Sequence, residues 1–281
     1  MSFFPCVDPE KEMDEQHGVD LVILPRTHDI GGFEVRRALP FRDKRMVGPF
    51  IFWDQMGPGE FLTGTGIAVR PHPLIGLSTV TCLFNGSLDH KDSLGSDMRI
   101  QPGELNLMSA GKGVVHSERT GRDVRDPTFV HEEKNRLPEF NEKGVKGRVI
   151  LGDFEGERSP AETQWDTIYV DVQLEAGATF RIPATHEERA LFAVQGNIEI
   201  NHIRYEPGRM LVLTPKEEIV LRALENTRLL LLGGAVMDGP RYIYWNFVAS
   251  TKERLEEAKE QWREQKFPTI PTDNKECIPL P

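Results

Sequence analysis

Short stretches in which apolar residues alternate with polar ones recur through most of the chain. Gly, Pro, Asn and Asp separate these stretches at the intervals typical of strands and turns. Clear examples lie at residues 79–88, 98–111, 189–213 and 228–234. The pattern predicts a mostly β protein, and Asn85-Gly86 between two apolar segments predicts a hairpin, because a type I′ turn needs positive φ at both central residues.

The two halves of the chain share a repeated half-motif of strand, Gly, strand, Pro-Gly and strand. It reads TCLFNG followed by IQPGELNLMSAG in the first half, and LFAVQG followed by YEPGRMLVLTP in the second. The repeat predicts two copies of one small barrel, and 281 residues suit two domains that each bury a core. We place the boundary in the polar stretch 131–147, which divides the chain into domains 1–134 and 135–281.

Helical periodicity is confined to one segment near the C-terminus. Residues 250–265 begin with a Ser-Thr pair suited to an N-cap and place Leu255, Ala258 and Trp262 at helical spacing. We expect a helix here that clamps the barrels together. The Pro-rich tail after it is expected to be extended.

Charge and composition exclude several classes of function. A net charge of −10 and a pI of about 5.4 oppose direct binding to nucleic acid, and we interpret the basic stretch 36–45 as a solvated strand and turn. No apolar run is long enough to span a membrane, and the acidic N-terminus is unlike a secretory signal, so we expect a cytoplasmic protein. The three cysteines lie far apart and predict free thiols.

Several motifs resemble one family. Gly66, His72, Leu74, Thr79 and Gly86 have the spacing of the first cupin motif, and residues 102–118 are similar to the second, which ends in a metal-binding histidine. Further stretches resemble the pirin family specifically, at residues 49–58, 69–84, 110–119 and 239–254. The resemblance runs from about residue 20 to the end. It implies an all-β bicupin, with two cupin (jelly-roll type) β-barrels packed together and a C-terminal helix.

The resemblance also implies one metal site, in the N-terminal barrel, with His72, His116 and Glu118 as ligands. Alternate residues of a strand share a face, so residue 116 shares an inward direction with 118, and 72 with 74. Two imidazoles and a carboxylate form the triad suited to non-haem Fe(II), with Mn, Co, Ni, Cu or Zn as alternatives. The family has a second histidine where this chain has Leu74, so we expect a weaker site with three protein ligands.

His90 could replace the missing ligand only if a bulge shifts the strand register. Across a turn at residues 85–86, position 90 pairs with Thr81 and points outward, while Val80, Cys82 and Phe84 point inward. We therefore expect His90 at the surface or behind the ligands.

The second barrel serves as an internal control. In the first barrel the four ligand positions lie at fixed distances along the chain from Gly86 and Gly103. The same distances from Gly196 and Gly208 lead only to apolar residues, namely Ile182, Ala184, Leu221 and Ala223. We expect no metal site there, and surface positions for His186 and His202.

Three functions remain open. Resemblance to pirins implies a quercetin 2,3-dioxygenase-type enzyme, in which a flavonol binds the metal, O2 adds, and the ring opens with loss of carbon monoxide; Glu118 is then the candidate base. Pirins also resemble metal-dependent coregulators, so a protein partner such as a transcription factor or a metabolic enzyme is the alternative. A metal-free scaffold is the third, and Leu74 favours it.

Overall fold

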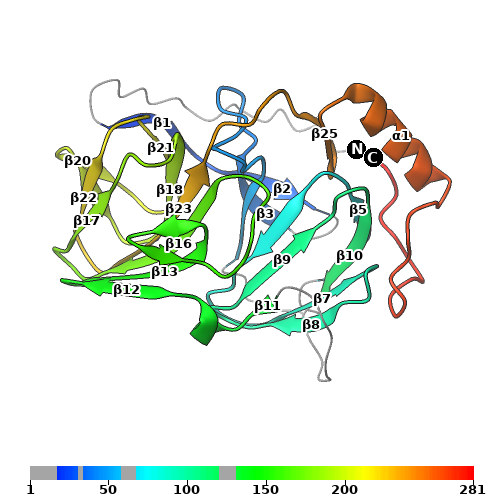
Figure 1. Ribbon diagram of the computed structural model, residues 1–281, viewed down its shortest axis with the longest axis horizontal. Coiled ribbons are helices and arrows are strands. Elements are labelled where there is room, and N and C mark those ends of the chain that lie inside the picture. The colour runs from blue at the N-terminus through cyan, green and yellow to red at the C-terminus, as the bar shows by residue number, and fades with distance from the viewer. Residues whose placement is uncertain (1–17, 31–33, 58–67, 120–130) are drawn as a thin grey trace. The chain divides into compact units, whose positions relative to one another are not determined.

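The computed structural model describes residues 18–30, 34–57, 68–119 and 131–281. Within them, strands account for almost all the regular structure, and the α-helix α1 (Lys252–Arg263) follows the last strand. The mostly β prediction with a C-terminal helix is therefore confirmed (Figure 1). None of the helices in these residues is both long and apolar enough to cross a membrane.

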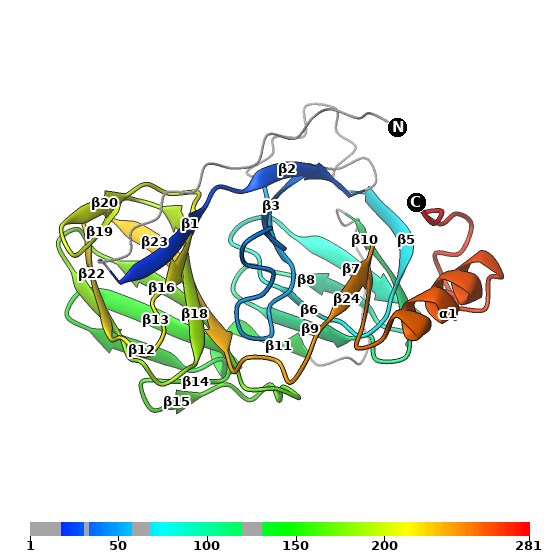
Figure 2. The same ribbon diagram turned by 90° about the horizontal axis from the view of Figure 1, so that it is seen from above.

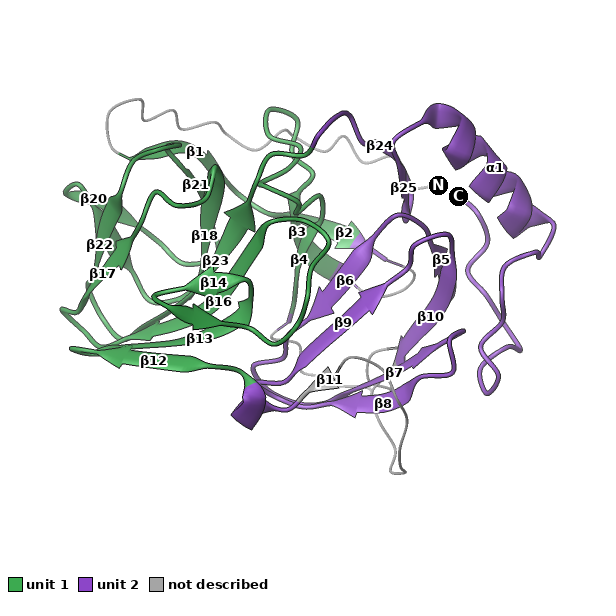
Figure 3. Cartoon of the chain, in the orientation of Figure 1, with its two compact units in different colours: residues 1–28, 35–56, 137–237 green, residues 29–34, 57–136, 238–281 purple. Residues whose placement is uncertain are grey.

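Two compact units share the chain, and each is assembled from separate segments. Unit 1 consists of residues 1–28, 35–56 and 137–237, and unit 2 of residues 29–34, 57–136 and 238–281 (Figure 3). A continuous division into 1–134 and 135–281 does not describe these units. The first strand pairs inside unit 1 with a strand from the second half of the chain, and the C-terminal helix and tail belong to unit 2.

Unit 1 contains a seven-stranded antiparallel sheet and a four-stranded one. The larger sheet has the order β1 (Val19–Ile23), β21 (Met210–Leu213), β18 (Glu188–Gln195), β23 (Thr227–Gly234), β16 (Thr167–Leu174), β13 (Val145–Leu151), β12 (Glu139–Glu142). The smaller has the order β17 (Thr179–Ile182), β22 (Ile219–Ala223), β19 (Ile198–Ile200), β20 (Ile203–Tyr205). Short additional sheets are formed by β2 (Arg26–Asp29), β3 (Glu34–Leu39) and β4 (Trp53–Met56), and by β14 (Asp153–Phe154) and β15 (Glu157–Arg158).

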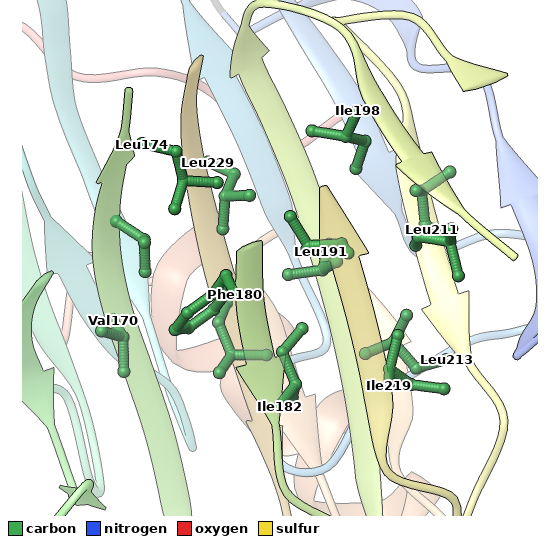
Figure 4. Packing of buried hydrophobic residues seen from close by; sticks show 14 of the residues in the cluster. Val170, Leu174, Phe180, Ile182, Leu191, Ile198, Leu211, Leu213, Ile219 and Leu229 are labelled. Carbon is green, nitrogen blue, oxygen red and sulfur yellow. The ribbon is translucent and has the colours of Figure 1, made fainter. Parts of the chain in front are cut away.

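The interior of unit 1 is apolar. Alternate residues of its strands, such as Val170 and Val172 on β16 and Leu229 and Leu231 on β23, point into one buried cluster. Figure 4 shows Ile182 in this cluster near Phe180 and Leu191. Burying each such side chain contributes about 1.5–3 kcal/mol to stability.

Unit 2 is built from two sheets, a hairpin and the helix. One sheet has the order β5 (Ala68–Leu74), β10 (Val114–Arg119), β7 (Leu88–Asp92), β8 (Asp97–Ile100), and the other β11 (His131–Glu132), β9 (Leu105–Ser109), β6 (Ser78–Thr81). The remaining elements are the 3-10 helix Lys134–Arg136 and the hairpin of β24 (Tyr242–Tyr244) and β25 (Phe247–Ala249). Figure 2 shows the strands of unit 2 arranged around an interior, with β5 next to β10.

The hairpin predicted at Asn85-Gly86 is wrong. Strand β6 pairs with β9, whereas β7 pairs with β10 and β8, so residues 82–87 connect the two sheets. Gly86 has a φ of +79°, so the backbone conformation expected of a turn glycine is present. The strand pairing inferred from that turn is absent. A tight turn can end a hairpin or lead the chain into another sheet, and the local sequence does not distinguish the two.

The helix α1 covers part of unit 2. The side chain of Thr251 accepts a hydrogen bond from the backbone N–H of Arg254 and so caps the first turn. Leu255 and Ala258 are buried in an apolar cluster with residues of β10, β25, the tail and the position just after β5, namely Ile75, Val115, Phe247, Phe267 and Ile270. The helix predicted over 250–265 is confirmed, and these packing partners all belong to unit 2.

Candidate metal centre

Four titratable side chains lie on the inner face of the sheet that contains β10. This strand supplies His116 and Glu118, β5 supplies His72 directly opposite His116, and β7 supplies His90 directly opposite Glu118. Residues that pair directly across strands share one face of the sheet, so all four point into the barrel of unit 2. All four are buried, and His90 is only 1% exposed.

Short distances join these side chains. The Nε2 atoms of His72 and His116 are 2.8 Å apart, and the rings of His90 and His116 lie 5.4 Å apart between centroids. Potential ligand atoms of His90, His116 and Glu118 all lie within 4.8 Å of one another. Across the ranges that the structure describes, no other group of three His, Cys, Asp or Glu residues converges in this way.

The expectation for His90 is wrong. It assumed that β7 returns beside β6, whereas β7 joins β10 and turns His90 toward Glu118. The missed signal was the alternation Leu88, His90, Asp92, in which each of the three is buried and the residues between them are more exposed. This alternation is the pattern of a strand that turns polar side chains toward the interior, because every second residue points to the same face.

The inward residues of β6 also differ from the prediction. Thr81 rather than Val80 faces the interior, because its side chain makes a hydrogen bond with Glu118. The alternation does not continue from β5 into β6, since β5 ends at Leu74 and β6 begins at Ser78 in the other sheet. Leu74 itself pairs with Val114 and so lies on the same face as His72, as predicted, where it packs in an apolar cluster with Met108, Ala110 and Val114.

Hydrogen bonds fix the orientation of two of the rings. His72 donates from Nδ1 to the backbone carbonyl of Arg70 over 2.9 Å, which leaves the lone pair on Nε2. His90 donates from Nε2 to Asp92 over 3.3 Å. The other oxygen of Asp92 accepts the backbone N–H groups of Leu94 and Ser96, so the carboxylate is held in place. Hydrogen bonds of this kind, from the second ring nitrogen to a carbonyl or carboxylate, are typical of metal-binding histidines.

Burial sets the protonation states of the site. It lowers the pKa of His72 to about 4, against the opposing hydrogen bond to Arg70, and it lowers the pKa of His116 well below its ordinary value. Both imidazoles are therefore neutral near pH 7, the form that binds metals. Burial raises the pKa of Glu118, and the hydrogen bond from Thr81 opposes this.

The residues fit a divalent transition metal. The His72 and His116 Nε2 atoms face each other, and Nδ1 of His116 is buried without a hydrogen-bond partner among the described residues. A neutral imidazole pair with a carboxylate beside it is a donor set for Fe, Mn, Co, Ni, Cu or Zn rather than for Ca or Mg, which prefer oxygen ligands.

Unit 1 presents no comparable side chains at the equivalent positions. Ile182, Leu221 and Ala223 are buried in its apolar core. Ala184 lies beyond the end of β17 and is exposed. It was expected to face the interior of the barrel and does not do so. His202 is exposed, and His186 Nδ1 lies 3.2 Å from a carboxylate oxygen of Asp166.

Two β-barrel units in one chain, each with its own buried interior, are the architecture of a bicupin. The family model described as Pirin matches residues 32–132, and that of the pirin C-terminal cupin domain matches residues 169–268. The chain belongs to the pirin family.

Individual relatives agree with this. A pirin-like protein of Caulobacter vibrioides is 41% identical over 94% of this chain and 99% of its own length, and the pirin of Homo sapiens is 25% identical over 90% and 95%. The crystal structure of a quercetin 2,3-dioxygenase from Acinetobacter baumannii superposes with a TM-score of 0.84 at 33% identity and covers 92% of this chain and 94% of that one.

Proposed function

We propose that this protein is a metal-dependent dioxygenase of the quercetin 2,3-dioxygenase type. The observation that carries the proposal is the convergence of His72, His90, His116 and Glu118 on one buried face of a β-barrel. The similarity of this chain to the Acinetobacter baumannii quercetin 2,3-dioxygenase supports the choice of reaction. The overall change is a flavonol plus O2 giving a ring-opened ester and carbon monoxide, with both oxygen atoms retained in the ester.

His72, His116 and Glu118 would hold one divalent metal, with His90 as an additional imidazole beside them. Fe(II) is the metal we propose, because two imidazoles and a carboxylate with open positions suit it; Mn, Co, Ni, Cu and Zn are alternatives. When bound, the metal supplies Lewis acidity toward the hydroxyl and carbonyl oxygens of the flavonol and brings O2 beside it.

Glu118 is the proposed base for the flavonol hydroxyl. Because burial raises the pKa of its carboxyl group, Glu118 holds a proton more strongly than an exposed carboxylate does, which favours taking the proton from the substrate. The hydroxyl of Thr81 donates to Glu118 and restrains its orientation. The proton returns to the product when the ring has opened, so Glu118 ends each cycle ionised.

A metal-dependent binding protein is the second candidate function. Leu94 lies in the turn between β7 and β8 and is 63% exposed, the most exposed of the large hydrophobic residues in the described part of the chain. The same turn is held by Asp92, which also orients His90. A metal bound at His90 could thus alter the turn that presents Leu94 to a protein partner.

The test measures O2 uptake and carbon monoxide release by the Fe(II)-loaded protein with quercetin. Equal amounts of O2 consumed and carbon monoxide released are expected, with turnover lost in Glu118→Gln and kept in Glu256→Gln, a control on the exposed side of α1. Full activity in Glu118→Gln would show that the carboxylate is neither ligand nor base. A protein that binds one metal yet consumes no O2 favours the binding function, and one that binds no metal favours the scaffold.

A further inference from the structure

Asn106 is a fully buried amide in the barrel of unit 2. It lies on β9 and pairs with Thr81 of β6. Thr81 points inward, since its side chain bonds to Glu118, and directly paired residues share a face. The next inward residue of β9 is Met108, which packs against Leu74 on the opposite sheet. Asn106 therefore faces the same interior as the metal centre.

The amide of Asn106 is unusual because none of the described residues satisfies it. Its side chain is 0% exposed, and in the described part of the chain neither Nδ2 nor Oδ1 has a hydrogen-bond partner. Buried amides in folded proteins are almost always hydrogen-bonded, because leaving them unpaired costs stability. A leucine of nearly the same size would fill this position without that cost, so the amide is not explained by packing.

The location of the amide indicates what it could bind. Thr81 separates Asn106 from Glu118, and Glu118 is the base in the proposed reaction. A side-chain amide offers a donor and an acceptor in one plane. That pair complements a planar molecule whose edge carries a hydroxyl beside a carbonyl, whereas a purely apolar ligand would leave both atoms of the amide unpaired.

We propose that Asn106 is a substrate-positioning residue that binds the hydroxyl and carbonyl edge of a planar aromatic substrate as it enters the metal centre, before Glu118 takes the hydroxyl proton. The inference rests on the proposed dioxygenase function and adds to it the residue that orients the substrate. Asn106 and Thr81 then form a polar strip on the sheet that faces the ligands, while Met108 and Leu74 form the apolar surface beside it.

The first experiment is Asn106→Leu, studied without substrate. Removing a buried polar group that has no partner leaves stability unchanged or raises it. The variant should bind one Zn²⁺ with the affinity of the parent and unfold at the same or a higher temperature. A clearly lower unfolding temperature would overturn the proposal, because it would show that the amide is already satisfied within the protein.

The second experiment titrates quercetin into Zn²⁺-loaded protein without O2, followed by tryptophan fluorescence. Asn106→Leu should bind quercetin at least tenfold more weakly, about 1.4 kcal/mol. Ser109→Ala, an exposed position on the same strand, should bind as the parent does. If Asn106→Leu does not fold, Asn106→Ala takes its place. Equal quercetin affinities in the parent and the Asn106 variant would overturn the proposal.

Failure of the dioxygenase proposal can be distinguished from failure of the role proposed for Asn106. If the parent binds no quercetin, that proposal fails, and 3-hydroxy-4-pyranone, which carries only the hydroxyl and carbonyl pair, replaces quercetin in the same titration. Tenfold weaker binding of this probe by Asn106→Leu would support the positioning role alone. No binding by the parent, or equal binding by both proteins, would overturn that role as well.

Discussion

Ser117 donates its hydroxyl hydrogen to Asp273 over 2.7 Å, and this bond joins the C-terminal tail to the strand that carries His116 and Glu118. Side chains alternate along a strand, so Ser117 points to the outer face while its two neighbours point inward. The tail is thus attached directly behind the metal centre, although Asp273 lies 156 residues further along the chain.

Two more bonds attach the tail to the neighbouring strands. Lys91 donates to the hydroxyl of Thr272 over 3.1 Å, and the backbone N–H of Ile278 donates to the carbonyl of Pro71 over 2.8 Å. Lys91 follows His90 and Pro71 precedes His72. Each of the strands that carry His72, His90, His116 and Glu118 therefore has an adjacent residue bonded to the tail.

The first prediction is that Asp273→Ala weakens metal binding, although Asp273 is not one of the proposed ligands. Loss of one hydrogen bond to a charged acceptor, about 1.5 kcal/mol, leaves β10 less restrained and should lower Zn²⁺ affinity by up to about tenfold. Competition with a chelating dye measures the affinity. Lys275→Ala, at an exposed tail position, is the control and should change nothing. Unchanged affinity in Asp273→Ala would mean that the strand holds its shape without the tail.

The second prediction concerns the stoichiometry and the ligands. Elemental analysis should find one ion per chain in the parent, none in His116→Ala, and one in His186→Ala and His202→Ala. His116 belongs to the cluster of potential ligands, whereas His186 and His202 lie in unit 1, where the described residues form no such cluster. His90→Ala should retain the ion with affinity at least tenfold weaker, about 1.4 kcal/mol. Two ions per chain would contradict a single site, and full affinity in His90→Ala would remove His90 from it.

The third prediction is a loss of stability of the metal-free protein in mild acid. The pKa of His72 is about 4 in the folded protein and 6.5 in its ordinary state, so between these values the unfolded chain binds more protons. The contribution of neutral His72 to the free energy of unfolding is complete above pH 6.5 and is lost as the pH falls toward 4, in total roughly 3 kcal/mol. Urea unfolding after chelation should show this decline, and His72→Gln should flatten it relative to His202→Gln. Parallel curves for parent and His72→Gln would refute the assignment.

The sequence predicted the fold class well because strands and their turn residues are local features. Motif spacing and alternation within a strand also predicted that His72, His116 and Glu118 face the interior, and the structure places them there. Their role as metal ligands stays a prediction. Partners across strands depend on how the chain passes from one sheet to the other, and residues 82–87 make that passage. For this reason His90 was assigned to the wrong face.

Long-range pairing also explains why the segments that make up each compact unit could not be derived from the sequence. Strand β1 pairs with β21, and the tail packs on β5, β7 and β10, so both ends of the chain join the unit formed by the opposite half. No composition change marks such an exchange. Asn106 was likewise unremarkable in the sequence, because an unpaired amide can be recognised only when its surroundings are known.

The last prediction concerns Leu74, where the family has a histidine. The Leu74–Val114 pair is followed along the same face by the His72–His116 pair, so an imidazole at position 74 would enter the interior beside His72. Leu74→His should therefore add a ligand and raise Zn²⁺ affinity at least tenfold, about 1.4 kcal/mol. At the same Zn²⁺ concentration, this tighter binding should give the metal-loaded variant a higher unfolding temperature than the metal-loaded parent.

The metal-free form of Leu74→His should behave in the opposite way. Leu74 packs against Met108 and Ala110, and replacing it with an imidazole removes apolar contacts and buries a polar ring, at a cost of about 2 kcal/mol or more. Calorimetric titration and thermal melting with and without Zn²⁺ separate the two effects, and Leu74→Phe, which keeps an apolar ring but offers no ligand, is the matched control. Opposite shifts in the two forms require the metal and position 74 to share one interior. Equal metal affinities in the parent and Leu74→His would mean that the site lies elsewhere or does not bind metal, and the metal-free scaffold would then be the better account of this barrel.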